Sequence, residues 1–245
     1  MRRNNEDSDD GYMREKQKVG RLRYVINRNG KRYDSIVSAI NPDKIISIVG
    51  AGGKSSIMFT LGEELAKADK VVTLTTTTRV LPYDLEIHKN MHLAFQKTDS
   101  HKLAGVDNPI ELAADCDFLL IEADGSRGYP LKMPAAHEPV IIDSTNQVIA
   151  VVGLSCIGRP IMQVCHRSEL VCDFLNKKEN DPVTVEDVRR IILSERGLSK
   201  GTAGRDMIVV LNQADTEREI ALGLEIAREL PDSVQCIITA YEDIN

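Results

Sequence analysis

The chain has 245 residues and a formal net charge of -6, which argues against a general nucleic-acid-binding protein, because such proteins usually carry a basic excess. Hydrophobic residues make up 42% and charged residues 28% of the sequence, as in an ordinary globular protein with a sizeable core. No apolar run approaches the roughly 18 residues that a membrane span needs, and no apolar signal core begins the chain, so we expect a cytoplasmic protein without a membrane partner.

The five cysteines are scattered and include no C-x-x-C pair. This distribution is typical of reduced thiols in a reducing compartment. It disfavours a zinc site, because no close pair supplies two ligands from one turn.

The N-terminal region divides into two parts. Residues 1–18 alternate charged and polar residues with almost nothing to bury, which predicts a disordered tail. Asn29-Gly30 then separates two strand-like runs, at 21–26 and 31–33, and this dipeptide favours a tight hairpin turn. We therefore expect residues 19–40 to form a small hairpin appendage that covers a sheet edge.

Residues 41–245 are predicted to form one α/β domain of the P-loop NTPase-like class, a mostly parallel sheet flanked by helices. The first unit is a buried strand at 44–49, a helix at about 55–68 and a second strand at 71–75. Thr184 is a typical N-cap of one further helix, and residues 216–230, followed by Pro231, predict another. Residues 81–106 are weakly patterned and predict loops with short elements. Four more apolar runs predict strands at 118–121, 148–152, 207–211 and 234–238.

A glycine-rich turn lies between the first strand and the first helix, in the order that favours phosphate binding. Glycine lets the backbone curl tightly and approach phosphate oxygens closely. In this interpretation Lys54 reaches the β- and γ-phosphates, and the Ser55 hydroxyl ligates Mg²⁺. The nucleotide-binding turn comprises Gly50, Ala51, Gly52, Gly53, Lys54, Ser55 and Ser56.

The turn departs from the standard G-x-x-x-x-G-K-[ST] pattern, because Ile48 occupies the position of the first glycine. The shorter G-x-x-G-K-S form is similar to that of the Mur ligases. The competing interpretation is a glycine turn with an incidental lysine.

The second strand ends in four threonines followed by Arg79. Ligands usually bind at this carboxyl edge of a parallel sheet. Thr77 is therefore predicted to order Mg²⁺ or water, and Arg79 to bind a phosphate or an anionic substrate. A capped turn after a β-rich run explains the same residues without a ligand.

Glu122 and Asp124 follow the buried run at 118–121, as in a Walker B arrangement. Two residues apart on an extended strand, both carboxylates face the same side. One is expected to serve Mg²⁺ and the other a water or substrate. Simple capping of the strand end is the alternative.

Residues 212–215 read Asn-Gln-Ala-Asp and resemble the N-K-x-D element of GTP-binding proteins. In that role Asp215 accepts hydrogen bonds from guanine and Asn212 supports the base and the loop. Thr239-Ala240, predicted to end the next strand, resembles the Ser-Ala element that contacts guanine O6. Guanine is therefore favoured, but Gln213 replaces the lysine that usually packs on the base and leaves ATP open.

Together these motifs resemble the YqeC family, from about residue 40 to the C-terminus. The departures are mild: Ser55-Ser56 stands where Thr-Thr is usual, and Arg127 where Lys is common. The resemblance is carried by residues 46–56, 122–132, 137–139, 153–155, 166–167, 198–201 and 212–215.

This resemblance implies an accessory protein in the maturation of selenium-dependent molybdenum hydroxylases, with such an enzyme or a cofactor-assembly protein as its partner. It also draws attention to a group of charged residues. Within a proline-punctuated loop, His137 is a candidate for proton relay or metal binding beside Glu138. Arg167 precedes a predicted helix, where its charge opposes the helix dipole and suggests an anionic partner or ligand nearby. The group comprises Lys132, His137, Glu138, His166 and Arg167.

The leading hypothesis is a Mg²⁺-dependent protein that binds GTP or ATP and hydrolyses it slowly, by in-line attack at the γ-phosphate. A second hypothesis is an ATP-dependent small-molecule kinase or ligase, in line with the short Mur-like turn. A third is a nucleotide-binding regulatory module without turnover.

Overall fold

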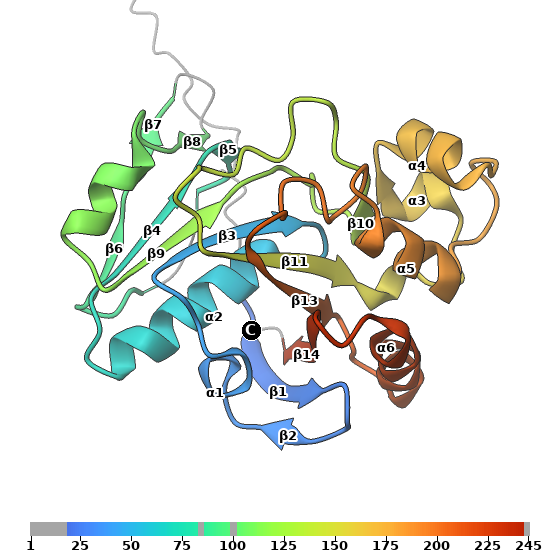
Figure 1. Ribbon diagram of the computed structural model, residues 1–245, viewed down its shortest axis with the longest axis horizontal. Coiled ribbons are helices and arrows are strands. Elements are labelled where there is room, and N and C mark those ends of the chain that lie inside the picture. The colour runs from blue at the N-terminus through green and yellow to red at the C-terminus, as the bar shows by residue number, and fades with distance from the viewer. Residues whose placement is uncertain (1–18, 83–85, 99–101, 243–245) are drawn as a thin grey trace, which may run out of the picture.

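The computed structural model of the protein is shown in Figure 1 and describes residues 19–82, 86–98 and 102–242. The predicted disordered tail at 1–18 lies outside the described residues. Within the described part of the chain, no helix combines the length and the apolar character that a membrane crossing requires.

A nine-stranded sheet forms the centre of the fold, in the order β2-β1-β14-β13-β11-β3-β9-β4-β6. All neighbouring strands from β14 to β6 run parallel, whereas β1 is antiparallel to both β14 and β2. The prediction of an α/β fold with a mostly parallel sheet is therefore confirmed. The strands are β1 Arg21–Asn27, β2 Arg32–Tyr33, β3 Ile45–Gly50, β4 Val72–Thr76, β6 Met91–Leu93, β9 Phe118–Glu122, β11 Gln147–Gly153, β13 Asp206–Asn212 and β14 Gln235–Glu242.

Helices cover both faces of this sheet (Figure 1). Successive residues of β11 belong to different cores, because side chains alternate along a strand. Val148, Ala150 and Val152 lie in the core that also contains residues of α3 to α6, whereas Ile149 and Val151 lie in the core that contains residues of α1 and α2. The helices are α1 Ile36–Ile40, α2 Lys54–Lys67, α3 Ile161–Val164, α4 Ser168–Leu175, α5 Val185–Leu193 and α6 Glu217–Glu229, with 3₁₀ turns η1 Pro109–Ala114 and η2 Leu154–Cys156.

The predicted helix starts are confirmed, with a local cause at each. Thr184 caps α5 and Thr216 caps α6, and each forms a reciprocal capping box with an acidic residue three positions later. The described part of the weakly patterned segment contains short strands, as predicted. Besides β6, they are β7 Gln96–Lys97 and β8 Leu103–Ala104, which form a small antiparallel sheet with β5 Arg79–Val80.

The expected strand end at Thr239-Ala240 is wrong, because β14 continues to Glu242. Pairing with β13 ends at Ile238, but the other edge of β14 stays paired with β1, whose Val25 lies opposite Thr239. The hairpin strand β1 is thus joined to the main sheet and extends β14 past the point where its parallel neighbour stops. This long-range pairing leaves no mark in the local apolar pattern.

Candidate functional site

The turn between β3 and α2, residues 50–56, is here called the glycine turn. Gly50, Gly52 and Gly53 have φ angles of 97°, 85° and 113°, a region that L side chains rarely adopt. A Cβ on Gly50 would lie 2.3 Å from the carbonyl oxygen of Val151, and a Cβ on Gly52 would lie 2.2 Å from the nitrogen of Gly153. The turn therefore needs glycine for both its backbone angles and its close contact with β11.

The N–H groups of the glycine turn fall into two sets. At the start of α2, Gly53 is the N-cap and no side chain of the described residues caps the helix, so the first-turn N–H groups of residues 54–56 have no intrahelical acceptor. The three earlier N–H groups instead hold the turn in shape. Gly50 donates to the Asp124 carboxylate at 3.0 and 3.1 Å, Ala51 to the Val151 carbonyl at 2.9 Å, and Gly52 to the Tyr129 carbonyl at 3.0 Å.

The Lys54 side chain folds back over the glycine turn. Its Nζ donates to the Gly50 carbonyl at 2.9 Å and lies 3.3 Å from Asp124 Oδ1 and 3.8 Å from Glu122 Oε1. Only 2% of this side chain is exposed. The structure thus brings the lysine and both predicted acids together, although they lie on different elements.

Glu122 and Asp124 have different surroundings. The Ser55 hydroxyl donates to Glu122 Oε2 at 2.9 Å, so these two oxygen groups lie side by side next to Lys54. Burial raises the pKa of Glu122, and the neighbouring Asp124 acts in the same direction, whereas Lys54 and Ser55 oppose the shift. Asp124, in contrast, accepts from the Gly50 N–H and contacts two lysines, Lys54 and Lys132.

Five side chains of alternating charge lead away from the glycine turn and are here called the buried ion chain, although its last member, Arg167, is partly exposed: Lys54, Asp124, Lys132, Glu138 and Arg167. Lys132 is completely buried; its Nζ lies 3.1 Å from Asp124, 2.9 Å from Glu138 and 2.7 Å from the Gly125 carbonyl. Arg167 donates to Glu138 at 3.0 Å. Where the sequence suggested an anionic partner or ligand near Arg167, the structure places the Glu138 carboxylate of the protein itself.

The buried ion chain also lowers the pKa of the Glu138 carboxyl group. Burial alone raises its pKa, but hydrogen bonds from Arg167 and Lys132 outweigh burial and lower the pKa to about 2. The motifs did not predict the pairing of Lys132 with Glu138. The position of Lys132 between Leu131 and Met133 could have predicted it, because a charge within an apolar run needs buried partners.

Asn212 connects three segments at the site. Its Nδ2 donates to the Gly52 carbonyl at 2.7 Å, and its Oδ1 accepts from the Thr239 hydroxyl at 2.9 Å. A Cβ on Gly53 would lie 2.4 Å from the same Nδ2. Asn212 therefore braces the glycine turn against β14.

The residues that follow Asn212 in the 212–215 loop differ in their contacts and exposure. Gln213 has a left-handed φ of 61°, and its side-chain oxygen accepts from Ser155 at 2.6 Å. Asp215 is exposed on the same loop. Ala240 is buried within β14 and pairs with Tyr24 of β1.

Thr77 and Arg79 lie at a neighbouring cleft of about 300 Å³. The Thr77 hydroxyl donates to the Val140 carbonyl at 2.8 Å, and Arg79 is exposed. Thr76 also lines the cleft and donates to the Glu122 carbonyl at 2.8 Å. The structure thus places Thr77 and Arg79 in a separate hollow beside the Glu122 strand end.

The two histidines behave differently. His137 is exposed, and no hydrogen bond or ion pair joins its side chain to the described residues. His166 ends β12 Cys165–His166, which pairs with β10 Leu131–Lys132, and its ring stacks on Tyr129 with centroids 6.2 Å apart. Burial lowers the pKa of His166, with Lys132 and Arg167 acting in the same direction, so the neutral imidazole is favoured.

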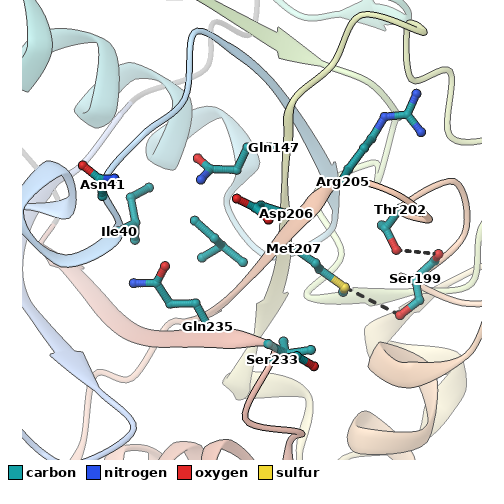
Figure 2. Close-up of a pocket in the computed structure, with 12 residues that line it drawn as sticks. Ile40, Asn41, Gln147, Ser199, Thr202, Arg205, Asp206, Met207, Ser233 and Gln235 are labelled. Carbon is teal, nitrogen blue, oxygen red and sulfur yellow. Dashed lines mark hydrogen bonds between the residues drawn. The ribbon is translucent and has the colours of Figure 1, made fainter.

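A larger cleft, of about 670 Å³, lies at the opposite edge of the sheet (Figure 2). Gln147, Asp206 and Gln235 begin β11, β13 and β14, so this cleft is at the amino ends of the strands, away from the glycine turn. Its other lining residues are Ile40, Asn41, Ser199, Thr202, Arg205, Met207, Ile208, Ser233 and Val234.

Comparison with known proteins points to one family. A family model described as YqeC protein matches residues 46–169, which include the glycine turn and every member of the buried ion chain. A relative from Escherichia coli (strain K12), named Uncharacterized protein YqeC, is 32% identical over 181 residues, covering 64% of this chain and 70% of the relative. No solved structure matches the chain. The chain belongs to the YqeC family.

Proposed function

We propose that the chain is a Mg²⁺-dependent P-loop protein that binds a purine nucleoside triphosphate at the glycine turn. The observation that carries this proposal is the buried Lys54, held between Glu122 and Asp124 at the uncapped start of α2. A helix start with free N–H groups and an adjacent cation favours a phosphate group. The turn lies at the carboxyl end of the interior strand β3, where parallel sheets usually bind ligands.

The arrangement divides the turn residues into two roles. Gly50, Ala51 and Gly52 keep the backbone in shape, because their N–H groups are already bonded within the protein. The N–H groups of residues 54–56 are the donors proposed to meet the phosphate oxygens. Lys54 would exchange its contacts with Gly50 and Asp124 for the β- and γ-phosphates.

Ser55 and Glu122 are the residues that would hold Mg²⁺. Their oxygen atoms lie 2.9 Å apart, and Mg²⁺ usually takes one or two protein oxygens together with phosphates and waters. Asp124 suits this role less well, since its carboxylate already accepts from Gly50 and contacts two lysines. When bound, Mg²⁺ would neutralise charge on the phosphates.

The base is proposed to lie against the loop at 212–215, with guanine favoured and ATP the alternative. Asp215 is exposed on this loop and stands at the motif position that accepts from guanine, so it is the residue proposed to read the base edge, while Asn212 supports the loop through Gly52 and Thr239. Ala240 is not included in this role. Backbone groups alternate sides along a strand, and since the Thr239 carbonyl accepts from Ala214 on the β13 side, the Ala240 N–H points toward β1.

The reaction proposed for this site is slow hydrolysis. A water oxygen forms a bond to the γ-phosphorus while the bond to the β,γ-bridging oxygen breaks, giving a nucleoside diphosphate and phosphate. Lys54 would balance the charge on the leaving diphosphate. A role as accessory factor in maturing selenium-dependent molybdenum hydroxylases belongs to the same proposal and rests on the family resemblance alone.

A second candidate is phosphoryl transfer to a small acceptor, as in a kinase or ligase. The cleft of about 300 Å³ that Thr76, Thr77 and Arg79 line is beside the Glu122 strand end and offers space for such a molecule. The catalytic role predicted for His137 belongs to this candidate and stays a prediction.

Isothermal titration calorimetry with GTP, ATP and their diphosphates, with and without Mg²⁺, tests the binding proposal. Lys54→Ala should weaken triphosphate binding about 100-fold, the effect of a charged hydrogen bond that contributes roughly 3 kcal/mol. The matched control is Lys67→Ala at the end of the same helix, an exposed lysine paired with Glu63, which should bind as the wild type does. Retained affinity in Lys54→Ala would contradict the proposal.

Phosphate release then separates the reaction classes. Release from GTP or ATP alone supports the NTPase, and release only with an added acceptor supports transfer. Binding without any release supports a regulatory module that does not turn over.

A further inference from the structure

The N-terminal hairpin contacts the 212–215 loop, although it lies outside the residues that the family model matches. Its strand β1 pairs with β14, with Tyr24 opposite Ala240 and Val25 opposite Thr239. Thr239 in turn holds Asn212, which holds the glycine turn. A continuous set of contacts therefore joins the hairpin to the candidate nucleotide site.

Tyr24 makes the direct contact with the loop. Its hydroxyl donates to the carbonyl oxygen of Ala214, and the N–H of the same Ala214 donates to the Thr239 carbonyl at 3.1 Å. Both backbone groups of Ala214 are thus held, one by the hairpin and one by β14. This fixes the peptide that immediately precedes Asp215.

The Tyr24 ring is itself held in place by two cations. The guanidinium carbons of Arg23 and Arg32 lie 5.8 and 5.3 Å from the ring centroid. Burial raises the pKa of Tyr24; Arg23 and Arg32 lower it, and Asp215 raises it, so all three charges act on this ring. The hydroxyl stays protonated and remains a donor at neutral pH.

Attachment of the hairpin does not depend on the Tyr24 hydroxyl. Arg28 anchors it separately, donating at 2.9 Å to the carbonyls of Ala227 and Leu230 and pairing with Asp232 at 2.9 Å. The β1–β14 ladder adds backbone pairing over residues 21–27. Loss of the Tyr24 hydroxyl therefore leaves these attachments of the hairpin in place.

We propose that Tyr24 is a positioning residue for base recognition, which holds the Ala214 carbonyl so that Asp215 faces the purine of the bound nucleotide. This inference rests on the proposed nucleotide-binding function. It assigns the hairpin a part in selecting the base, with the phosphates bound independently at the glycine turn.

The test compares a nucleotide with a ligand that has no base. Calorimetry measures binding of GTP, ATP and inorganic tripolyphosphate, each with Mg²⁺, to the full chain and to Tyr24→Phe. GTP affinity should fall about three- to tenfold, the effect of one lost hydrogen bond, whereas tripolyphosphate affinity should stay within about twofold. Tyr33→Phe, on the same hairpin, should leave both affinities unchanged.

A double-mutant cycle separates positioning from general loosening. In an Asp215→Ala background, Tyr24→Phe should have no further effect on GTP binding, because the group that it positions is gone. Equal losses for GTP and tripolyphosphate, or an undiminished effect in that background, would overturn the inference. If the wild type binds neither ligand, the proposed function itself fails; if it binds both and Tyr24→Phe changes neither, only the role of Tyr24 fails.

Discussion

The amino ends of the strands border a cleft and the carboxyl ends border the glycine turn. The two edges differ in how many charged side chains they bury. The amino edge has the larger cleft, about 670 Å³, yet among the described residues that line it only Arg205 and Asp206 are charged. The Arg205 guanidinium donates to backbone carbonyls, including those of Thr145 and Gly201, and Asp206 is exposed. At the carboxyl edge, Lys54, Asp124 and Lys132 are 3%, 1% and 0% exposed.

The carboxyl edge is therefore distinguished by buried charged side chains, and the amino edge by the volume of its cleft. Burying several ionised groups is costly unless they pair, so a fold gains little stability from such a group compared with an apolar core. A cleft at the amino edge carries no comparable energetic cost, because the described residues that form it include no buried ionised side chain. Buried charge, not volume, is therefore the feature on which the proposed site rests, and the following experiments test this contrast.

Replacing Lys132 by Met should have the largest effect. The change leaves Asp124 and Glu138 buried without their shared cation and should lower the free energy of unfolding by about 3–5 kcal/mol, measured by urea denaturation. The exposed Lys67–Glu63 pair is the control, and Lys67→Met should cost less than about 1 kcal/mol. If the two substitutions lowered the free energy of unfolding equally, the contrast between buried and surface charge would be wrong.

The stability of the protein should depend on pH through Glu138. Its pKa is lowered from 4.5 to about 2, so its contribution is fully present above pH 4.5 and is lost as the pH falls toward 2. Glu138→Gln should lower the free energy of unfolding by about 1.5–3 kcal/mol at neutral pH. It should also remove most of the loss of stability between pH 4.5 and 2. Unfolding curves at several pH values measure both effects; an unchanged loss of stability at acid pH in the variant would show that Glu138 is not responsible.

Asn212→Ala should affect binding of the whole ligand. Because Asn212 braces the Gly52 carbonyl, its loss should weaken both GTP and tripolyphosphate about tenfold, unlike Tyr24→Phe, which affects the base alone. Calorimetry with both ligands is the measurement. Asn90→Ala is the control, because the Asn90 side chain donates to the Ala66 carbonyl at the far end of α2. A loss confined to GTP would place Asn212 at the base instead of the turn.

The smallest effect is expected at the amino edge. Asp206→Asn and Ser233→Ala, both in the larger cleft, should change GTP affinity by less than about twofold in the same titrations, because surface substitutions away from the site usually cost little. A tenfold loss in either variant would mean that the two edges act together.

Much of the fold was predictable because its causes are local. The continuous apolar run of β11, the threonines at the starts of α5 and α6, and the strand-turn-helix order around Lys54 all depend on residues close together in the chain. The order of acidic and Asn-containing segments after strands also indicated which residues meet at the carboxyl edge.

The sequence by itself therefore determined the α/β class, the glycine turn and the strand ends that carry polar residues. Only the tertiary structure decided the partners: Asp124 with Gly50 across 74 residues, Asn212 with Gly52 across 160, and Tyr24 with Ala214 across 190. The physical reason is that periodic patterns report which side of an element is buried, but not which distant group completes a buried hydrogen bond or ion pair.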